Sequence, residues 1–203
     1  MKPVVRPRLL LAALGLLLLL AVWLSLALGP VSLPLGETLR AGLRLLGVPL
    51  DGAGLERAEL ILGQIRVPRT LLGLAVGAVL ALTGVSMQGL FRNPLADPGL
   101  VGVSSGAAMG AAFAIVLGAA WGGLPEVLAP YLLSASAFAG GLLVTGLVFR
   151  LGRREGQTSV AYMLLAGVAL TALSGAVIGL LTYLADDATL RSLTFWNLGS
   201  LNG

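Results

Sequence analysis

Residues 9–28 read LLLAALGLLLLLAVWLSLAL, a run that contains twelve leucines and no charged side chain. A helix needs about 20 apolar residues to cross the hydrocarbon core of a bilayer, which is roughly 30 Å thick. Each leucine favours insertion by roughly 0.3–0.6 kcal/mol, whereas one arginine at the helix centre costs about 2.5–3.5 kcal/mol. The run therefore predicts a membrane-spanning helix.

Four further stretches of comparable length also lack Asp, Glu, Lys and Arg. The five predicted spans cover residues 9–36, 70–91, 98–125, 127–149 and 156–185. Only 11% of the 203 residues are charged, 57% are hydrophobic and the mean hydropathy is +0.97, whereas about 25% of the residues in a soluble domain are charged. The sequence predicts an all-α fold, a polytopic transmembrane helix bundle with five full spans and the lead-in to a sixth.

The N-terminus allows two interpretations. Lys2, Arg6 and Arg8 precede the first apolar run, and residues 27–29 loosely resemble the cleavage site of a secretory signal. The run is longer than the usual signal core of about 7–15 residues, and four more spans follow it, so a retained helix is favoured. Positive charges near span ends favour the cytoplasmic side. We therefore expect the N-terminus and residues 150–155 to be cytoplasmic and residues 35–69 to form an outward-facing surface segment.

This outward segment is the one long polar stretch of the chain. Leu35, Leu39, Leu43 and Leu46 recur in it at helical spacing, which predicts an amphipathic helix that lies on the membrane surface or packs on the protein's own outer face. Residues 47–54 should form a loop. A second helix is expected to start near Leu55 and to run into the second span, bent by the proline at position 68.

The composition excludes several kinds of chemistry. The chain has no His and no Cys, so it offers no imidazole base, thiolate nucleophile or usual zinc site. Its single lysine is Lys2, which leaves no phosphate-binding Walker A loop. We expect no enzymatic activity, cofactor or metal site, and the modest net charge of +4 suggests no nucleic-acid partner. None of the five spans contains an ionisable side chain, which argues against a proton-driven carrier.

Small residues form stripes along several spans. Such stripes allow helix backbones to approach closely in lipid, and we expect helix packing at Gly73, Gly77, Gly106, Gly110, Gly167, Gly175 and Gly179. The sequence does not decide whether the stripe on the fifth span faces a central passage or a neighbouring helix.

Residues 87–106 read MQGLFRNPLADPGLVGVSSG between the second and third spans. Prolines 94 and 98 interrupt the helix, and Asn93 and Asp97 are typical turn and cap residues. The stretch resembles the M-Q-x-x-x-x-N-P-L-A-x-P-x-x-L-G-x-x-x-G pattern in permease subunits of ABC importers for ferric siderophores, haem and vitamin B12 (FecCD-type). Three further stretches are similar to elements of that family: RVPRTL at 66–71, LAGVAL at 165–170 and FWNLGSL at 195–201.

The resemblance implies a mechanism and its partners. Two permease copies would surround a passage, a cytoplasmic ABC ATPase would hydrolyse ATP, and an extracytoplasmic binding protein would deliver an iron chelate, haem or cobalamin. Arg66 and Arg69 would then meet carboxylates of the binding protein, with Arg66 projecting outward from a fixed place; the alternative is that they anchor the second span at lipid headgroups. Asn93 and Asp97 are expected to be turn braces rather than a metal or substrate site.

The resemblance also implies a cytoplasmic gate region at Thr158, Ser159, Val160 and Ala161, where small side chains suit a constriction. The alternative is a helix N-cap by Thr158 or Ser159. Members of the family have about twice as many spans, so residues 1–203 form a single, apparently truncated permease domain of the cell inner membrane that should not transport by itself. A secondary transporter or channel and an inactive half-permease remain the alternatives, and the sequence does not distinguish the possible substrates.

Overall fold

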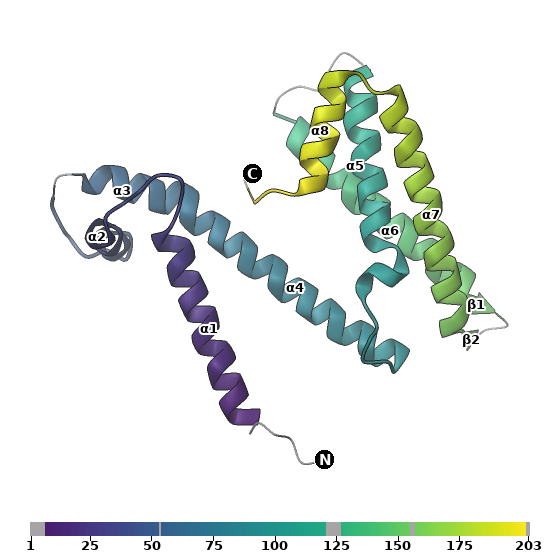
Figure 1. Ribbon diagram of the computed structural model, residues 1–203, viewed down its shortest axis with the longest axis horizontal. Helices are drawn as coiled ribbons and strands as arrows, with labels where there is room; N and C mark the ends of the chain where they lie inside the picture. Colours follow the sequence, from purple (N-terminus) through teal and green to yellow (C-terminus); the bar gives the residue numbers. More distant parts are fainter. Residues whose placement is uncertain (1–6, 53, 121–126, 155–156, 202–203) are drawn as a thin grey trace. The chain divides into compact units, whose positions relative to one another are not determined.

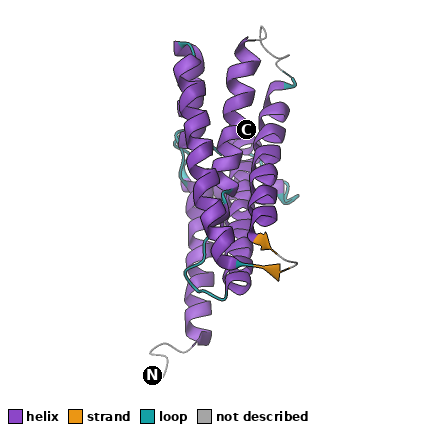
Figure 2. Ribbon diagram, turned by 90° about the vertical axis from the view of Figure 1, so that its right-hand side faces the viewer, coloured by secondary structure: helices purple, strands orange, loops and turns teal. Residues whose placement is uncertain are grey.

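The structure is a computed structural model that describes residues 7–52, 54–120, 127–154 and 157–201. The described part of the chain is almost entirely helical (Figure 2). It divides into two compact units, Met1–Ala78 and Val79–Gly203, each with its own buried clusters. The sequence-based expectations for Lys2, Arg6 and residues 121–125 concern positions outside the described residues.

The first unit contains two helical segments that precede a long, continuous helix (Figure 1). The two preceding segments are α1 (Pro7–Ala27) and α2 (Leu35–Leu45). The long helix consists of α3 (Leu55–Ile61), a π-helical turn (Leu62–Arg66) and α4 (Val67–Phe91), of which the first part belongs to this unit. The predicted first span reached residue 36, but α1 ends at Ala27. Gly29 and Pro30 follow directly, and glycine and proline both weaken or interrupt the helical hydrogen-bond ladder.

The amphipathic helix α2 packs on the protein and also exposes leucines. Its buried face meets α3 and the π turn through a cluster of Ala41, Ala58 and Leu62. An ion pair joins Arg44 Nε to Glu59 Oε2 at 3.3 Å, with about a third of each side chain exposed, so it contributes little. The predicted stripe of Leu35, Leu39, Leu43 and Leu46 remains exposed. One face of the helix therefore packs on α3, as the second alternative expected, and the opposite face exposes the leucine stripe.

The second unit is a bundle in which α5, α6 and α7 pack on one another. After the end of α4 its elements are a 3₁₀ helix (Pro98–Val101), α5 (Val103–Ala120), α6 (Ala129–Gly152), β1 (Arg153–Arg154), β2 (Gln157–Thr158), α7 (Val160–Leu184) and α8 (Asp187–Leu198). The strands form a two-residue antiparallel ribbon in which Arg153 pairs with Thr158. This ribbon was not predicted from the sequence.

Two apolar clusters stabilise this bundle. One gathers Phe91, Val101, Val148 and Met163 at the end where α4 stops and α7 begins. The other joins Ala112, Leu181 and Leu193 and so attaches α8 to α5 and α7. The segment that was predicted to lead into a sixth span is thus a twelve-residue helix that packs on the bundle.

Four helical stretches in the described residues are long and apolar enough to cross a membrane: Pro7–Ala27, Leu55–Phe91, Tyr131–Gly152 and Val160–Leu184. The third predicted span, 98–125, corresponds to the shorter α5. That helix starts only at Val103, because residues 98–101 form a 3₁₀ turn and Gly102 has φ +74°. At about 1.5 Å per residue, the 18 residues of α5 cover about 27 Å, slightly less than the roughly 30 Å apolar core.

Glycines bring the backbones of α5 and α6 into direct contact. A Cβ atom at Gly106 would lie 2.6 Å from the Gly140 carbonyl oxygen, and one at Gly110 would overlap the Ser136 carbonyl oxygen. Gly167 of α7 lies in the same way against the carbonyl of Leu100. By contrast, no atom of the described structure lies within 4 Å of a Cβ built at Gly77, Gly175 or Gly179. The stripe on α7 is therefore in close contact at one end and open over the rest.

We expect Gly110→Ala to destabilise the second unit, because its methyl group would collide with backbone that cannot rotate away. Overpacking of this kind costs about 1–3 kcal/mol. Thermal unfolding of the purified protein in detergent measures the effect. Gly175→Ala is the matched control: it adds the same methyl group in open space and improves helix propensity by up to about 1 kcal/mol. Equal stability of the two variants would contradict the close α5–α6 contact.

Candidate functional site

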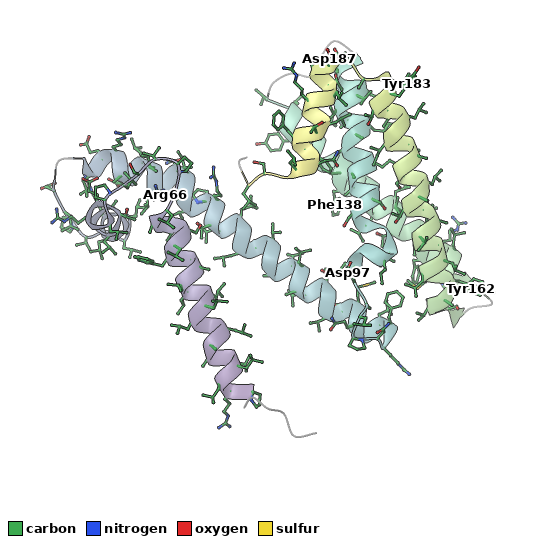
Figure 3. The ribbon with its side chains drawn as sticks, viewed as in Figure 1. Arg66, Asp97, Phe138, Tyr162, Tyr183 and Asp187 are labelled. Atoms are coloured by element: carbon green, nitrogen blue, oxygen red, sulfur yellow. The ribbon has the colours of Figure 1, made fainter. Side chains whose placement is uncertain are left out.

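The Arg66 side chain points into the first unit (Figure 3). Arg66 is the last residue of the π turn, and only 6% of its surface is exposed. Its Nη1 donates to the carbonyl oxygens of Leu26 at 2.7 Å and Ala27 at 2.8 Å, and its Nη2 donates to that of Val31 at 2.5 Å. The guanidinium thus caps the end of α1 from a position about 40 residues later in the chain.

This capping replaces the outward projection that the sequence analysis expected for Arg66. The last carbonyls of a helix lack intrahelical partners and carry partial negative charge, so a cation at that end is favourable. No carboxylate in the described residues lies within ion-pair distance of Arg66. Its charge is therefore balanced by carbonyl dipoles, and its donors are already in use.

The π turn explains why Arg66 faces inward. Pro68 has no N–H to donate to the carbonyl four residues earlier, and its ring disfavours a regular α-helical turn before it. In the structure the Val67 N–H bonds to the Leu62 carbonyl, five residues back. This π geometry adds a residue to the turn and changes the direction of the side chains in it. Pro68 therefore produces a local π turn rather than the simple bend that was expected.

Arg69 differs from Arg66. It lies one turn further along α4, is partly exposed and makes no hydrogen bond or ion pair with any described residue. Its neighbour Thr70 is occupied, because its hydroxyl lies 2.7 Å from that of Ser25 in α1. Of the two arginines that were expected to meet a partner, only Arg69 has an uncommitted guanidinium.

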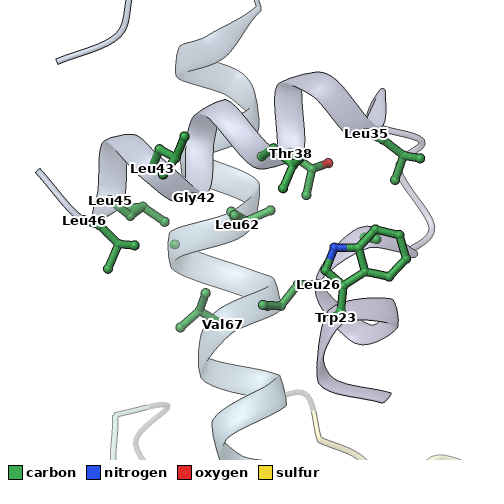
Figure 4. A pocket seen from close by; sticks show the side chains of 13 residues that line it. Trp23, Leu26, Leu35, Thr38, Gly42, Leu43, Leu45, Leu46, Leu62 and Val67 are labelled. Atoms are coloured by element: carbon green, nitrogen blue, oxygen red, sulfur yellow. The ribbon is translucent and has the colours of Figure 1, made fainter. Parts of the chain in front are cut away.

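An apolar groove of about 550 Å³ lies beside this junction (Figure 4). Trp23 and Leu26 of α1 form one wall, Leu39 and Leu43 of α2 a second, and Val67 of α4 part of a third. The groove offers Thr38 as a polar side chain and no charge. Its chemistry suits apolar groups rather than a charged chelate.

The turn after α4 is held by its own side chains. The Asn93 Oδ1 accepts from the Leu95 N–H at 2.9 Å, and the Asp97 Oδ1 accepts from the Gly99 N–H at 2.7 Å. Asp97 occupies the N-cap position of the 3₁₀ helix, and Arg92 before it has a left-handed φ of +48°. Both side-chain oxygens are engaged in bracing the turn, and no group of three or more acidic residues able to hold a metal ion occurs in the described part of the chain.

The proposed gate region lies at the start of α7. Thr158 ends the β ribbon, and Ser159 takes the N-cap position, with Val160 and Ala161 in the first turn of the helix. The Ser159 side chain makes no capping hydrogen bond; its backbone N–H instead bonds to the Gly152 carbonyl at 2.9 Å. The alternative of a side-chain N-cap by Ser159 is therefore wrong, because the ribbon already fixes this helix start.

The aspartate cap of α8 was not predicted from the sequence. The Asp186 Oδ1 accepts from the Thr189 N–H at 2.9 Å, and hydrogen bonds from the Thr189 side chain and backbone hold the pKa of that carboxyl below its usual 3.8. The signal was an aspartate three residues before a threonine at the start of a helix. The cap is complete above the usual pKa and is lost as the pH falls through the lowered value.

The FecCD transport family matches residues 17–203. The chain belongs to this family. It is 49% identical over 138 residues to the hemin transport system permease protein HmuU of Yersinia pestis, an alignment that covers 68% of this chain and 40% of the relative. It is 42% identical over 193 residues to the vitamin B12 import system permease protein BtuC of Salmonella paratyphi A, covering 95% and 52%.

A solved structure described as an inward-facing conformation of a metal-chelate type ABC transporter is similar to this FecCD chain. It gives a TM-score of 0.72 at 33% identity and covers 97% of this chain and 54% of its own. The matches to BtuC and to this solved structure cover almost all of this chain but only about half of each relative. The chain thus spans about half the length of these relatives. The resemblance seen in the sequence motifs is confirmed, and so is the all-α polytopic architecture.

We expect Asp97→Ala to lower the stability of the purified protein by about 1 kcal/mol, the usual effect of losing a helix-capping oxygen. Asp97→Asn keeps an acceptor and serves as the control, so its thermal unfolding in detergent should stay close to that of the parent protein. A comparable loss in both variants would show that the negative charge, rather than the cap, is what the turn needs.

Proposed function

We propose that this FecCD chain is the transmembrane permease subunit of an ABC importer. The observation that carries the proposal is the family match over residues 17–203 together with 42–49% identity to haemin and vitamin B12 permeases. The long apolar helices support a multi-pass location in the cell inner membrane. ATP is hydrolysed by a separate cytoplasmic subunit, since the chain has no Walker A loop.

In this mechanism two permease copies enclose a passage, and an extracytoplasmic binding protein delivers the cargo. Helices that contact one another closely through glycines move as rigid groups, because a closely packed interface has few intermediate arrangements. Such uncharged, closely packed spans suit a passage that a separate ATPase opens and closes. Residues 158–161 are the proposed cytoplasmic constriction, and the β ribbon fixes their position relative to α6. Arg69 supplies a cation for docking that makes no hydrogen bond or ion pair with the described residues, because charged groups at a rim steer association.

The proposed cargo is a large metal chelate: haem, a cobalamin or a ferric siderophore. The two groups of relatives are named for haemin and vitamin B12, and the structural neighbour is described as a metal-chelate transporter. These cargoes bring their own metal ligands, so the permease needs none. This accords with a chain that has neither His nor Cys.

Uptake by right-side-out vesicles loaded with ATP tests the proposed function directly. With a partner ATPase and an added binding protein, we expect accumulation of haemin, cyanocobalamin or a ferric siderophore to require ATP. A protonophore should leave it largely unchanged, because no span carries a proton-binding side chain. Vesicles with a hydrolysis-deficient ATPase are the control. Uptake that stops with the protonophore and persists without ATP would point to a secondary transporter.

The proposed topology has the N-terminus and residues 150–155 in the cytoplasm. Because the chain contains no cysteine, Gly52→Cys and Arg153→Cys each create a single thiol. We expect a membrane-impermeant maleimide added to intact cells to label the first and not the second, and added to inverted vesicles to label the second and not the first. Labelling of both thiols from the same side would mean that an even number of spans separates them, which would contradict the proposed topology.

A further inference from the structure

The apolar groove beside α2 lies at the depth of a membrane interface. The 21 residues of α1 cover about 31 Å at 1.5 Å per residue, close to the roughly 30 Å thickness of the hydrocarbon core. The last residue of this helix, Ala27, lines the groove, and so does Trp23 one turn earlier. Tryptophan is enriched where the hydrocarbon meets the headgroups. Lipid chains and lipid headgroups are therefore both close to the groove.

The helix α2 lies across the direction of α1. In Figure 1 α2 is seen end-on, whereas α1 runs in the plane of the view. Figure 4 shows α2 on one side of the groove and Trp23 and Val67 on the other. Leu39 and Leu43 of α2 line the groove and are 57% and 46% exposed. An amphipathic helix that lies parallel to the membrane with apolar side chains toward the hydrocarbon is typical of the interface.

The groove is formed before any ligand enters it. Arg66 donates to the carbonyls of Leu26 and Ala27, and these bonds fix the wall that α1 contributes. The volume of about 550 Å³ lies within the usual range of ligand sites, about 300–1,000 Å³. The hydroxyl of Thr38 in the lining already donates to the Pro34 carbonyl oxygen at 3.3 Å. The groove therefore suits a hydrocarbon chain rather than a polar group.

The charged side chains of α2 differ in whether they have a partner. Arg44 pairs with Glu59 at 3.3 Å. The Glu37 carboxylate lies against the start of α3, where a Cβ built at Gly54 would be 3.5 Å from its Oε1. Arg40 is exposed and makes no hydrogen bond or ion pair with any described residue. This arginine is therefore the charged group of α2 that is available to a ligand.

We propose that the groove is a phospholipid site: one acyl chain lies between α1 and α2, and Arg40 binds the phosphate of an anionic headgroup. Arg40 precedes Leu43 of the groove by three residues, and residues at this spacing are neighbours on the surface of a helix. One lipid molecule therefore contacts both. A guanidinium binds phosphate oxygens through paired hydrogen bonds, and anionic lipids attract basic residues near the membrane surface. The site is independent of the transported cargo.

Quenching of Trp23 fluorescence in nanodiscs tests this site. The chain has three tryptophans, so replacing Trp121 and Trp196 by phenylalanine leaves Trp23 alone. We expect brominated phosphatidylglycerol to quench it with saturation at a low mole fraction. Brominated phosphatidylcholine with the same chains should quench only in proportion to its mole fraction, as contact with bulk lipid does. Proportional quenching by both lipids would overturn the proposal. Quenching by neither lipid would also overturn it, because protein such as a second copy would then cover the groove.

A leucine in the groove tests the acyl-chain position. A Cβ at Gly42 would lie 3.8 Å from Cδ2 of Leu62, an ordinary contact, so the longer side chain of Gly42→Leu extends into the groove. We expect this variant to lose the saturable quenching. Gly36→Leu is the matched control: it lies on the same helix, no described atom lies within 4 Å of its Cβ, and it should keep the saturable quenching. The same result in both variants would overturn the acyl-chain position.

Two arginine variants test the headgroup contact. We expect Arg40→Gln to weaken the binding of phosphatidylglycerol by about fivefold, the effect of one basic residue at an anionic surface. Arg44→Gln removes the same charge from the same helix and should leave the binding close to that of the parent protein, because Arg44 is paired with Glu59. Equal losses in the two variants would show a general effect of charge and would overturn the role of Arg40.

Thermal unfolding in detergent gives a second measurement that needs no fluorescent probe. A ligand that binds only the folded state stabilises it. Phosphatidylglycerol should therefore raise the unfolding temperature of the parent protein more than phosphatidylcholine does, and this difference should disappear in Gly42→Leu and shrink in Arg40→Gln. An equal shift with both lipids in the parent protein would overturn the proposal.

Discussion

A chain in lipid must satisfy its backbone hydrogen bonds from within, since the hydrocarbon core offers no water to replace a missing partner. This constraint explains the long helices and also the places where they stop. At the end of α1 the free carbonyls receive the guanidinium of Arg66. After α4 the free N–H groups receive Asn93 and Asp97, and before α8 they receive Asp186. At these three breaks a side chain completes the hydrogen bonding, whereas α2, α3, α6 and α7 begin without a side-chain cap.

Much of this arrangement could be predicted from the sequence. Uncharged runs located the long helices, and the prolines with Asn93 and Asp97 indicated the turn between α4 and α5. The inward direction of Arg66 could not be predicted in this way, because it depends on a π turn whose extra residue changes which side chains face α1. Sequence spacing also did not show that α6 is the partner of Gly106 and Gly110, since a small-residue stripe does not specify the helix that it contacts.

The two arginines show how a sequence motif and a structure inform function differently. Both lie in a stretch that resembles the FecCD family, and both are suitable in charge for an acidic partner. Burial and hydrogen-bond partners separate them: Arg66 is saturated by carbonyls, whereas Arg69 is partly exposed and uncommitted. Family membership rests on the whole chain, whereas the identity of the cargo depends on surfaces that relatives with different cargoes do not share.

The π turn has a consequence for how this junction tolerates change in length. A π turn amounts to one residue inserted into an α-helix, so deleting one residue within Leu62–Arg66 would allow a regular helix to form. Because each residue advances an α-helix by about 100° (3.6 residues per turn), the segment before the deletion would rotate by about that angle relative to the segment after it. Ala58 and Leu62 would then leave α2, with which they form a buried cluster. Single-residue indels should therefore be far rarer here than substitutions among related sequences.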